Sequence, residues 1–182
     1  LRTPMASIYG FSELMSRRKL SPERQAEVIA TIHRQSELMI AIVNELLDLA
    51  RIEARRDKDF ELETVELSAL VDGVLNEFRP PQDRSGPSRR GDAAGLQVRV
   101  DRNKMRQALG NVLSNAYKYS PAGGAVQVAL SVDADRARMV GIEVTDAGIG
   151  MTAEQLARVS ERFYRADASG NIPGTGLGMS IV

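Results

Sequence analysis

A seam of apolar residues between Val28 and Leu49 is compatible with few folds. Its members recur in alternating steps of three and four, interrupted only by Gln35: Val28, Ile32, Met39, Ile42, Leu46 and Leu49. This spacing predicts a long helix with a coiled-coil-like stripe, widened by Ile29, Val43, Leu47 and Ala50. The predicted start is at Ser21-Pro22-Glu23, which combines a capping hydroxyl, a proline suited to the first helical position and a carboxylate at the positive end of the helix dipole.

A second amphipathic helix precedes this one. Its apolar positions are Leu1, Met5, Ile8 and Met15, with polar Ser12 interrupting them and Pro4 tolerable in a first turn. Two helices joined by a short loop cannot bury so wide a stripe against each other. We therefore predict that residues 1–55 form a helical hairpin that homodimerises as a four-helix bundle.

The pattern changes after a charged run from Arg55 to Lys58. The alternation from Phe60 to Val65 predicts a half-buried strand, so that residues 56–66 form a linker and first strand, and residues 67–182 a second domain. Ser68 is expected to cap a short helix that ends near Phe78, and the Pro-, Gly- and Arg-rich stretch 80–95 is expected to be irregular.

The remaining elements mix helices with antiparallel strands. A strand over residues 96–100 leads to Asp101, which can cap a helix whose predicted buried stripe is Met105, Leu109, Val112 and Ala116. Alternating apolar residues over 126–132 and 140–144 predict a hairpin around residues 133–135, and Thr152 begins a capping box. Elements in this order favour an α+β two-layer sandwich with its helices on one face of the sheet.

Composition excludes several classes of function. Lys+Arg and Asp+Glu balance at 24 each, so no basic field attracts nucleic acid. The chain has no cysteine and a single histidine, His33, which argues against thiolate or multi-histidine metal sites. No apolar run approaches the roughly 18–20 residues of a membrane-spanning helix, so we expect no membrane contact within residues 1–182.

Three sets of residues offer groups suited to a metal ion, a phosphate or an exocyclic amine. Asn111, Asn115 and Lys118 follow at i, i+4 and i+7, so one helix face offers amide oxygens suited to Mg²⁺ and an ammonium suited to phosphate. A solvated helix face is the alternative. Asp146-Ala-Gly148-Ile-Gly150 follows a strand, where the carboxylate can accept a hydrogen bond from an exocyclic amine, or merely close an Asx turn.

The third set is Gly174-Thr175-Gly176-Leu177-Gly178, directly before an apolar helix start. Its backbone N–H groups can face phosphate oxygens, although a flexible loop is the alternative. Its spacing matches neither GxGxxG nor the ordinary P-loop. Residues 161–171 between the two glycine motifs read as a lid over a ligand, with Phe163 expected to pack rather than to stack on a base.

In this order the sets resemble the N box, first glycine box, F box and second glycine box of the sensor histidine kinases, whose Bergerat-type (GHKL) ATP-binding fold is shared with DNA gyrase. The residues are Asn111 to Pro121, Asp146 to Gly150, Phe163-Tyr-Arg165 and Gly174 to Gly178. Leu1-Arg-Thr3-Pro4 resembles the tail of the family's H box, His-Glu-Leu-Arg-Thr-Pro, and residues 46–54 resemble the end of its second dimerisation helix. The resemblance is weakest over residues 79–95, where a strand expected in the family is not evident.

The resemblance implies a role for each matching residue. Asn115 would ligate Mg²⁺ with Asn111 close to the metal, Lys118 would reach a phosphate of ATP, Tyr119 would flank the nucleotide, and Asp146 would recognise the adenine amine.

The glycine motifs and two further residues also receive roles by this resemblance. Gly148 and Gly150 would shape the pocket floor, and the segment Gly174, Thr175, Gly176, Leu177 and Gly178 would approach the phosphates. Arg165 would assist the γ-phosphate. Thr3 would orient water for dephosphorylation of a response regulator, unless its hydroxyl serves only the helix start.

The function implied is the ATP-dependent protein-histidine kinase core of a cytoplasmic two-component system, within the cytoplasmic part of a bacterial inner-membrane sensor. The acceptor histidine would stand two residues before Leu1, outside this sequence, and the phosphoryl group would pass to an aspartate of a response regulator receiver domain. We expect His33 to have a structural or exposed role and the sequence to be an excised segment, cut at both ends. The alternatives are another GHKL-type ATPase and a dimerisation or scaffold module that does not use nucleotide.

Overall fold

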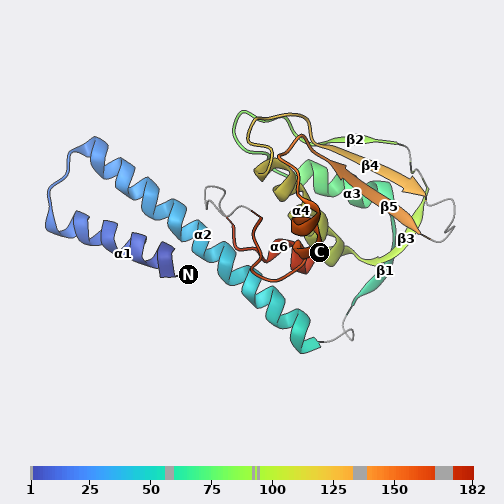
Figure 1. Cartoon of the computed structure of the whole chain (residues 1–182), viewed down its shortest axis with the longest axis horizontal. Helices are drawn as coiled ribbons and strands as arrows, with labels where there is room; N and C mark the ends of the chain where they lie inside the picture. The colour runs from blue at the N-terminus through green and yellow to red at the C-terminus, as the bar shows by residue number, and fades with distance from the viewer. Residues whose placement is uncertain (1, 56–59, 92, 94, 133–138, 167–173) are drawn as a thin grey trace. The chain divides into compact units, whose positions relative to one another are not determined.

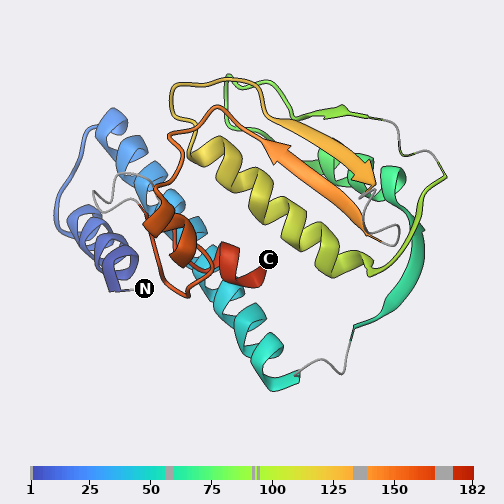
Figure 2. The same cartoon turned by 45° about the vertical axis from the view of Figure 1, so that its right-hand side comes forward.

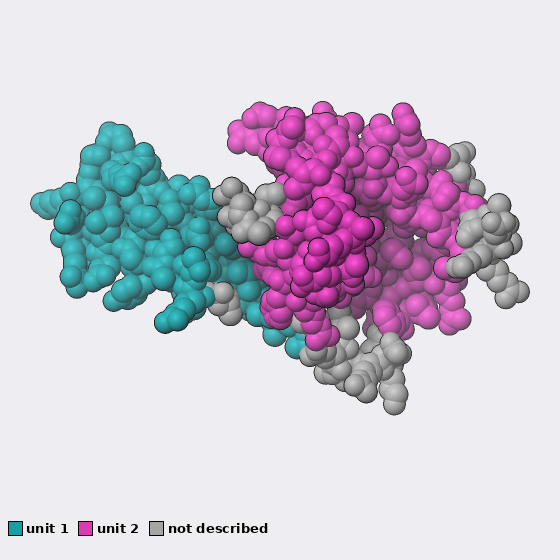
Figure 3. Space-filling model, in the orientation of Figure 1, with its two compact units in different colours: residues 1–55 teal, residues 56–182 magenta. Residues whose placement is uncertain are grey.

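The structure is a computed structural model of the whole chain and describes residues 2–55, 60–91, 93, 95–132, 139–166 and 174–182. Two compact units, residues 1–55 and 56–182, are shown in separate colours in Figure 3. The expectations for Leu1, for the charged run 56–58, for the turn 133–135 and for residues 167–171 lie outside the described residues. In the part that is described, no helix is both long and apolar enough to cross a membrane.

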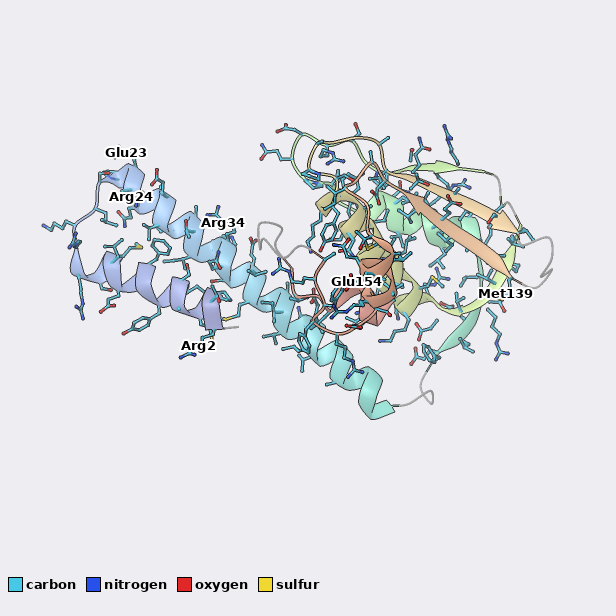
Figure 4. All side chains as sticks on the ribbon, in the orientation of Figure 1. Arg2, Glu23, Arg24, Arg34, Met139 and Glu154 are labelled. Atoms are coloured by element: carbon cyan, nitrogen blue, oxygen red, sulfur yellow. The ribbon has the colours of Figure 1, made fainter. Side chains whose placement is uncertain are left out.

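The first unit is a helical hairpin of α1 (Arg2–Arg17) and α2 (Pro22–Arg55) (Figure 1). Helix α2 begins where the sequence predicts, because the Ser21 hydroxyl accepts a hydrogen bond from Arg24 N at 3.3 Å. Glu23 and Arg24 lie at this end of the helix (Figure 4). Hydrogen bonds from its own backbone N–H and from Ser21 hold the pKa of Glu23 below its usual value.

The hairpin buries one apolar stripe and leaves another open. Val28 is 2% exposed, Pro4 is buried, and the predicted seam residues Ile32, Met39, Ile42 and Leu46 are half-buried. Large apolar side chains remain exposed on both helices: Met5, Tyr9, Ile29, Ile40, Val43 and Leu47. The second stripe is thus available for a further apolar partner.

In its described residues the second unit has five strands in two sheets. β1 (Leu62–Glu66) pairs with β3 (Gln97–Asp101) in an antiparallel ladder. The other sheet has the order β2-β4-β5, in which β2 (Ser88–Arg90) runs parallel to β4 (Gln127–Val132), and β4 runs antiparallel to β5 (Val140–Thr145).

Two helices supply most of the packing against the strands. α3 (Leu67–Glu77) and α4 (Arg102–Lys118) bury their apolar faces with strand residues in one core, and α4 runs alongside the β4–β5 hairpin (Figure 2). The core includes Leu67, Val71, Val74, Leu109, Leu113, Ala116, Tyr117, Val126, Val128 and Leu130. The short helices α5 (Ala153–Arg158) and α6 (Gly178–Ile181) follow. This architecture confirms the predicted α+β sandwich.

The strand expected after the charged run is present as β1, in which Val65 is buried and Leu62 is 49% exposed, and Phe60, which precedes the strand, is 56% exposed. Three local expectations were wrong. Ser68 does not cap α3: it lies inside the helix and donates a hydrogen bond to Glu66. A strand is present within 79–95, namely β2. On α4 the buried positions include Leu113 and Tyr117, while Met105 and Val112 are half-buried.

Candidate functional site

Helix α4 carries the predicted polar residues and is fixed at its first turn. Asp101 accepts hydrogen bonds from Lys104 N at 3.0 Å and from Glu61 N at 3.2 Å, so its carboxylate joins the start of α4 to the chain before β1. The Lys104 backbone N–H holds the pKa of Asp101 below its usual value. With Leu109 and Leu113 buried, the side chains of Asn111, Asn115 and Lys118 stay half-buried on the same helix.

The second glycine motif contacts this helix at two points. Asn111 Nδ2 donates a hydrogen bond to the Gly178 carbonyl at 3.2 Å. A Cβ atom on Gly174 would lie 3.2 Å from Lys118 Cε and closer still to its ammonium, so the loop passes directly over the lysine. The Lys118 ammonium also lies 4.7 Å from the centre of the Tyr119 ring. The structure therefore places a positive charge and an amide beside the glycine backbone.

The first glycine motif meets the end of α4. Asp146 is exposed, and its Oδ1 accepts hydrogen bonds from Gly148 N at 2.7 Å and from the Ser120 hydroxyl at 3.5 Å. Ile149 N donates to the Tyr119 carbonyl at 3.0 Å. Among the described residues no group hydrogen-bonds Asp146 Oδ2, so this exposed carboxylate can accept a hydrogen bond from a ligand amine.

Close contacts with backbone atoms require glycine at two positions of the glycine motifs. A Cβ on Gly148 would lie 2.6 Å from the Tyr119 carbonyl oxygen, which is closer than real Cβ contacts. Gly176 has φ +76°, and a Cβ there would lie 2.7 Å from the Tyr164 carbonyl oxygen. Gly150 also has a positive φ, +67°, but open space around it. Close backbone approach thus explains two of these glycines and a left-handed turn the third.

The segment between the glycine motifs differs from its prediction. Phe163 is 62% exposed with φ +62°, so its expected packing role is wrong. Tyr164 is half-buried instead, with the Arg158 guanidinium 4.3 Å from its ring centre. Arg165 is half-buried, and Leu177 is fully buried with its N–H donating to the Thr175 hydroxyl at 3.2 Å.

The ligand atoms around α4 fit a magnesium ion that takes most of its ligands from water and from the phosphates of its substrate. Among the described residues, no cluster of three carboxylate, histidine or cysteine side chains is present. The Asn115 side chain makes no hydrogen bond within the described part of the chain, so its amide oxygen can coordinate a cation. Mg²⁺ typically takes one or two protein oxygens and completes its shell with water and phosphate, which such a helix face can accommodate.

Thr3 and His33 belong to the first unit. Thr3 is exposed in the first turn of α1. His33 is exposed on α2, with Nδ1 3.8 Å from Glu37 Oε1. A residue that sequence reasoning did not assign is Ser120, which is 1% exposed and contacts Asp146; its position directly after Tyr119 was the signal for it.

Two segments of the chain match known families. Residues 1–55 match the model of the His Kinase A (phospho-acceptor) domain, and residues 100–182 match that of the Histidine kinase-, DNA gyrase B-, and HSP90-like ATPase. The solved structure of a mycobacterial sensor histidine kinase, MprB, is 31% identical with a TM-score of 0.51, covering 66% of this chain and 74% of that one. The chain belongs to the sensor histidine kinases.

Other sensor kinases are similar along the whole chain. The histidine protein kinase DivJ of Caulobacter vibrioides is 35% identical over 190 residues, which cover 100% of this chain and 31% of DivJ. The structure of full-length ShkA in complex with AMPPNP is 26% identical with a TM-score of 0.66, covering 99% of this chain and 37% of ShkA. The chain spans between about a fifth and two-fifths of the length of the curated relatives that it matches.

Proposed function

We propose that this chain is the ATP-dependent histidine kinase core of a two-component system. The observation that carries the proposal is the meeting of both glycine motifs at α4: the Asp146 loop rests on the Tyr119 carbonyl, and the loop at Gly174–Gly178 rests on Asn111 and Lys118. A carboxylate suited to adenine and an ammonium suited to phosphate thus both lie near the C-terminal end of α4. The ShkA relative binds an ATP analogue, AMPPNP, which agrees with this assignment.

Each part of the site has a proposed role. The exposed Asp146 carboxylate accepts a hydrogen bond from the adenine amine, and the Tyr119 ring flanks the nucleotide. The Lys118 ammonium neutralises phosphate charge, and Arg165 assists at the γ-phosphate. Gly148 and Gly150 shape the floor, while the backbone of Gly174, Thr175, Gly176, Leu177 and Gly178 lies close to the phosphates.

Asn115 would hold Mg²⁺, with Asn111 beside it. The ion, when bound, supplies charge neutralisation for the phosphates. The hydrogen bond from Asn111 Nδ2 to the Gly178 carbonyl has a separate effect, because it holds the second glycine loop against α4.

The proposed reaction transfers the γ-phosphoryl group to a histidine. An imidazole nitrogen attacks the γ-phosphorus, a P–N bond forms, and the bond to the β,γ-bridging oxygen breaks as ADP leaves with the electron pair. By the H-box resemblance the acceptor stands two residues before Leu1 in the longer protein. We do not assign this role to His33, which lies outside that motif. The phosphoryl group then passes to an aspartate carboxylate of a response regulator receiver domain. Thr3 serves the opposing hydrolysis, in which it orients a water that attacks the aspartyl phosphate and releases inorganic phosphate and the free carboxylate.

The first unit is proposed to dimerise in the cytoplasm through its open stripe. At roughly 100° per residue, the exposed residues Ile29, Ile40, Val43 and Leu47 share one face of α2 that is about 90° from the seam facing α1. Two such stripes per helix are what a four-helix bundle needs. Replacing Leu47 with glutamate is expected to give monomers in sedimentation experiments, whereas Glu37→Gln, an exposed polar change on α2, leaves dimers. A dimeric Leu47 variant would contradict this interface.

Calorimetric titration with Mg·ADP tests the nucleotide site. Asp146→Asn is expected to abolish measurable binding. The Asn amide N–H₂ would then face the adenine amine, and two hydrogen-bond donors cannot bond to each other. Glu143→Gln is the matched control, since Glu143 is an exposed carboxylate on the strand that leads to Asp146. A folded chain that does not bind Mg·ADP would instead favour a scaffold module, and equal binding by both variants would remove Asp146 from the site.

A further inference from the structure

Arg84 connects the irregular segment between α3 and β2 to the turn that follows α4. Its Nη1 donates a hydrogen bond to the Ser120 carbonyl at 2.9 Å, and its Nη2 donates to the Gly124 carbonyl at 2.9 Å. Its guanidinium carbon also lies 5.1 Å from the centre of the Tyr117 ring. One half-buried side chain therefore bridges two carbonyls of a turn that is 36 and 40 residues away in sequence.

The segment around Arg84 is itself held in place. Arg84 N donates to the Pro81 carbonyl at 3.1 Å, closing a turn in which Asp83 has φ +65°. The Tyr117 hydroxyl donates to the Ser85 carbonyl at 2.7 Å, and the Tyr117 ring stacks on Phe78 with centroids 5.2 Å apart. These contacts hold the residues before and after Arg84, so the backbone places its guanidinium in a defined position beside the turn.

The turn that Arg84 holds also supports the loop that carries Asp146. The Ser120 hydroxyl donates to Asp146 Oδ1, and the adjacent Tyr119 carbonyl accepts the Ile149 N–H. Gly124, with φ +104°, lies so close to Ala147 that a Cβ there would be 2.5 Å from the alanine Cβ. Both ends of the segment 119–124 thus touch the segment 146–149. Within this segment Arg84 binds the carbonyls of Ser120 and Gly124, and the Tyr119 carbonyl directly precedes that of Ser120.

We propose that Arg84 is a positioning residue for the adenine site, acting through the turn 120–124 to hold Asp146 where it meets the base. This inference rests on the proposed nucleotide site and adds a residue outside the four motif boxes. Charge-assisted hydrogen bonds are roughly twice as strong as neutral ones, and the planar guanidinium fits two acceptors at once. A lysine ammonium at the same position lacks that fork, so it can retain only part of the effect.

Hydrogen exchange in the nucleotide-free chain tests the mechanical part. In Arg84→Ala the amides of Gly148 and Ile149 are expected to exchange roughly tenfold faster, because their acceptors are no longer held by a fixed turn. The β1–β3 amides should keep their wild-type rates. Arg89→Ala is the matched control: this arginine of β2 pairs with Asp72 at 2.8 Å and donates a hydrogen bond to the Gly91 carbonyl, and both partners lie outside the turn 120–124.

Titration with Mg·ADP tests the consequence for binding. Arg84→Ala is expected to raise the Kd roughly tenfold, which corresponds to the loss of about one charge-assisted hydrogen bond. Arg84→Lys should fall between this variant and the wild type, and Arg89→Ala should match the wild type. In an Asp146→Asn background, Arg84→Ala should accelerate exchange of the Gly148 amide by a smaller factor than in the wild-type background. The reason is that the carboxylate acceptor of this amide, which Arg84 positions, has been replaced.

The outcomes separate this inference from the proposed function. Unchanged Gly148 and Ile149 exchange in folded Arg84→Ala, or in Arg84→Lys should the alanine variant not fold, would overturn the positioning role. Faster exchange with unchanged ADP affinity would overturn it as well. If the wild-type chain binds no Mg·ADP, the proposed function fails, while the exchange rates still decide whether Arg84 holds the loop.

Discussion

Alanine at position 148 would place a methyl group in a contact that has room only for hydrogen. Its Cβ would lie 2.6 Å from the Tyr119 carbonyl oxygen and 2.6 Å from Asp146 Oδ1. The carbonyl is not free to retreat, since it accepts the Ile149 N–H at 3.0 Å. We expect the turn to open, so that Asp146 loses the 2.7 Å hydrogen bond from the amide of residue 148.

Two terms set the size of the effect. A hydrogen bond to a charged group contributes about 1.5–3 kcal/mol, and overpacking a tight contact costs about 1–3 kcal/mol. Because Asp146 is exposed, the lower part of the first range applies. A loss of about 2 kcal/mol in adenine recognition corresponds to a roughly 30-fold rise in the Kd for Mg·ADP. The free energy of unfolding should fall by about 1–3 kcal/mol through the overpacking.

Calorimetric titration with Mg·ADP and urea denaturation measure both quantities. Gly141→Ala is the matched control, since a Cβ on Gly141 would also be crowded, at 2.7 Å from Ser131 Oγ, but on β5 away from Asp146. The Ser131 hydroxyl can rotate away from this Cβ, so Gly141→Ala should change stability little and leave the affinity for ADP unchanged. The reasoning would be refuted by a folded Gly148→Ala chain that binds ADP as the wild type does, or by an equal loss of affinity in both variants.

Two further predictions follow from α4. Asn115→Ala should weaken ADP binding roughly tenfold in the presence of Mg²⁺ and leave metal-free binding unchanged; titrations with and without Mg²⁺ check this, and a retained magnesium effect would contradict it. Asp101→Ala should lower the free energy of unfolding by about 1 kcal/mol at neutral pH through loss of the cap. Since the folded-state pKa of Asp101 lies below its ordinary value of 3.8, this contribution is present above that pH and is lost as the pH falls through the lowered pKa. Urea denaturation at pH 7 and pH 3 should therefore show a smaller difference between wild type and variant at pH 3.

Local chemistry made several features predictable from the sequence. The caps at Ser21, Asp101 and Thr152 each depend on a backbone N–H only three residues away, and each is confirmed by a hydrogen bond. The alternation of Val126, Val128 and Leu130 also places all three in the core. Such features need no knowledge of distant parts of the chain, because the interacting groups are neighbours in the sequence.

Features that depend on a distant partner were missed. The alternation predicted a half-buried strand at β1 but did not indicate which of its residues would be buried, and in the folded unit it is Val65 rather than Leu62. β2 has three residues, Ser88–Arg90, and is stabilised as a strand by its parallel pairing with β4. Three polar residues in a Pro- and Gly-rich stretch have no periodicity to reveal such a strand.

The candidate site shows the same division between local and distant causes. The residues proposed to touch nucleotide were identified from the sequence because their type and spacing suit a ligand: amides and an ammonium on one helix face, a carboxylate at a strand end, and glycines. The group that supports them has no such pattern. Arg84 lies in a segment expected to be irregular, and its two acceptors are backbone carbonyls, which every residue possesses. A side chain that acts on the common backbone therefore gives no sequence signal, and its contribution follows only from where the folded chain places Ser120 and Gly124.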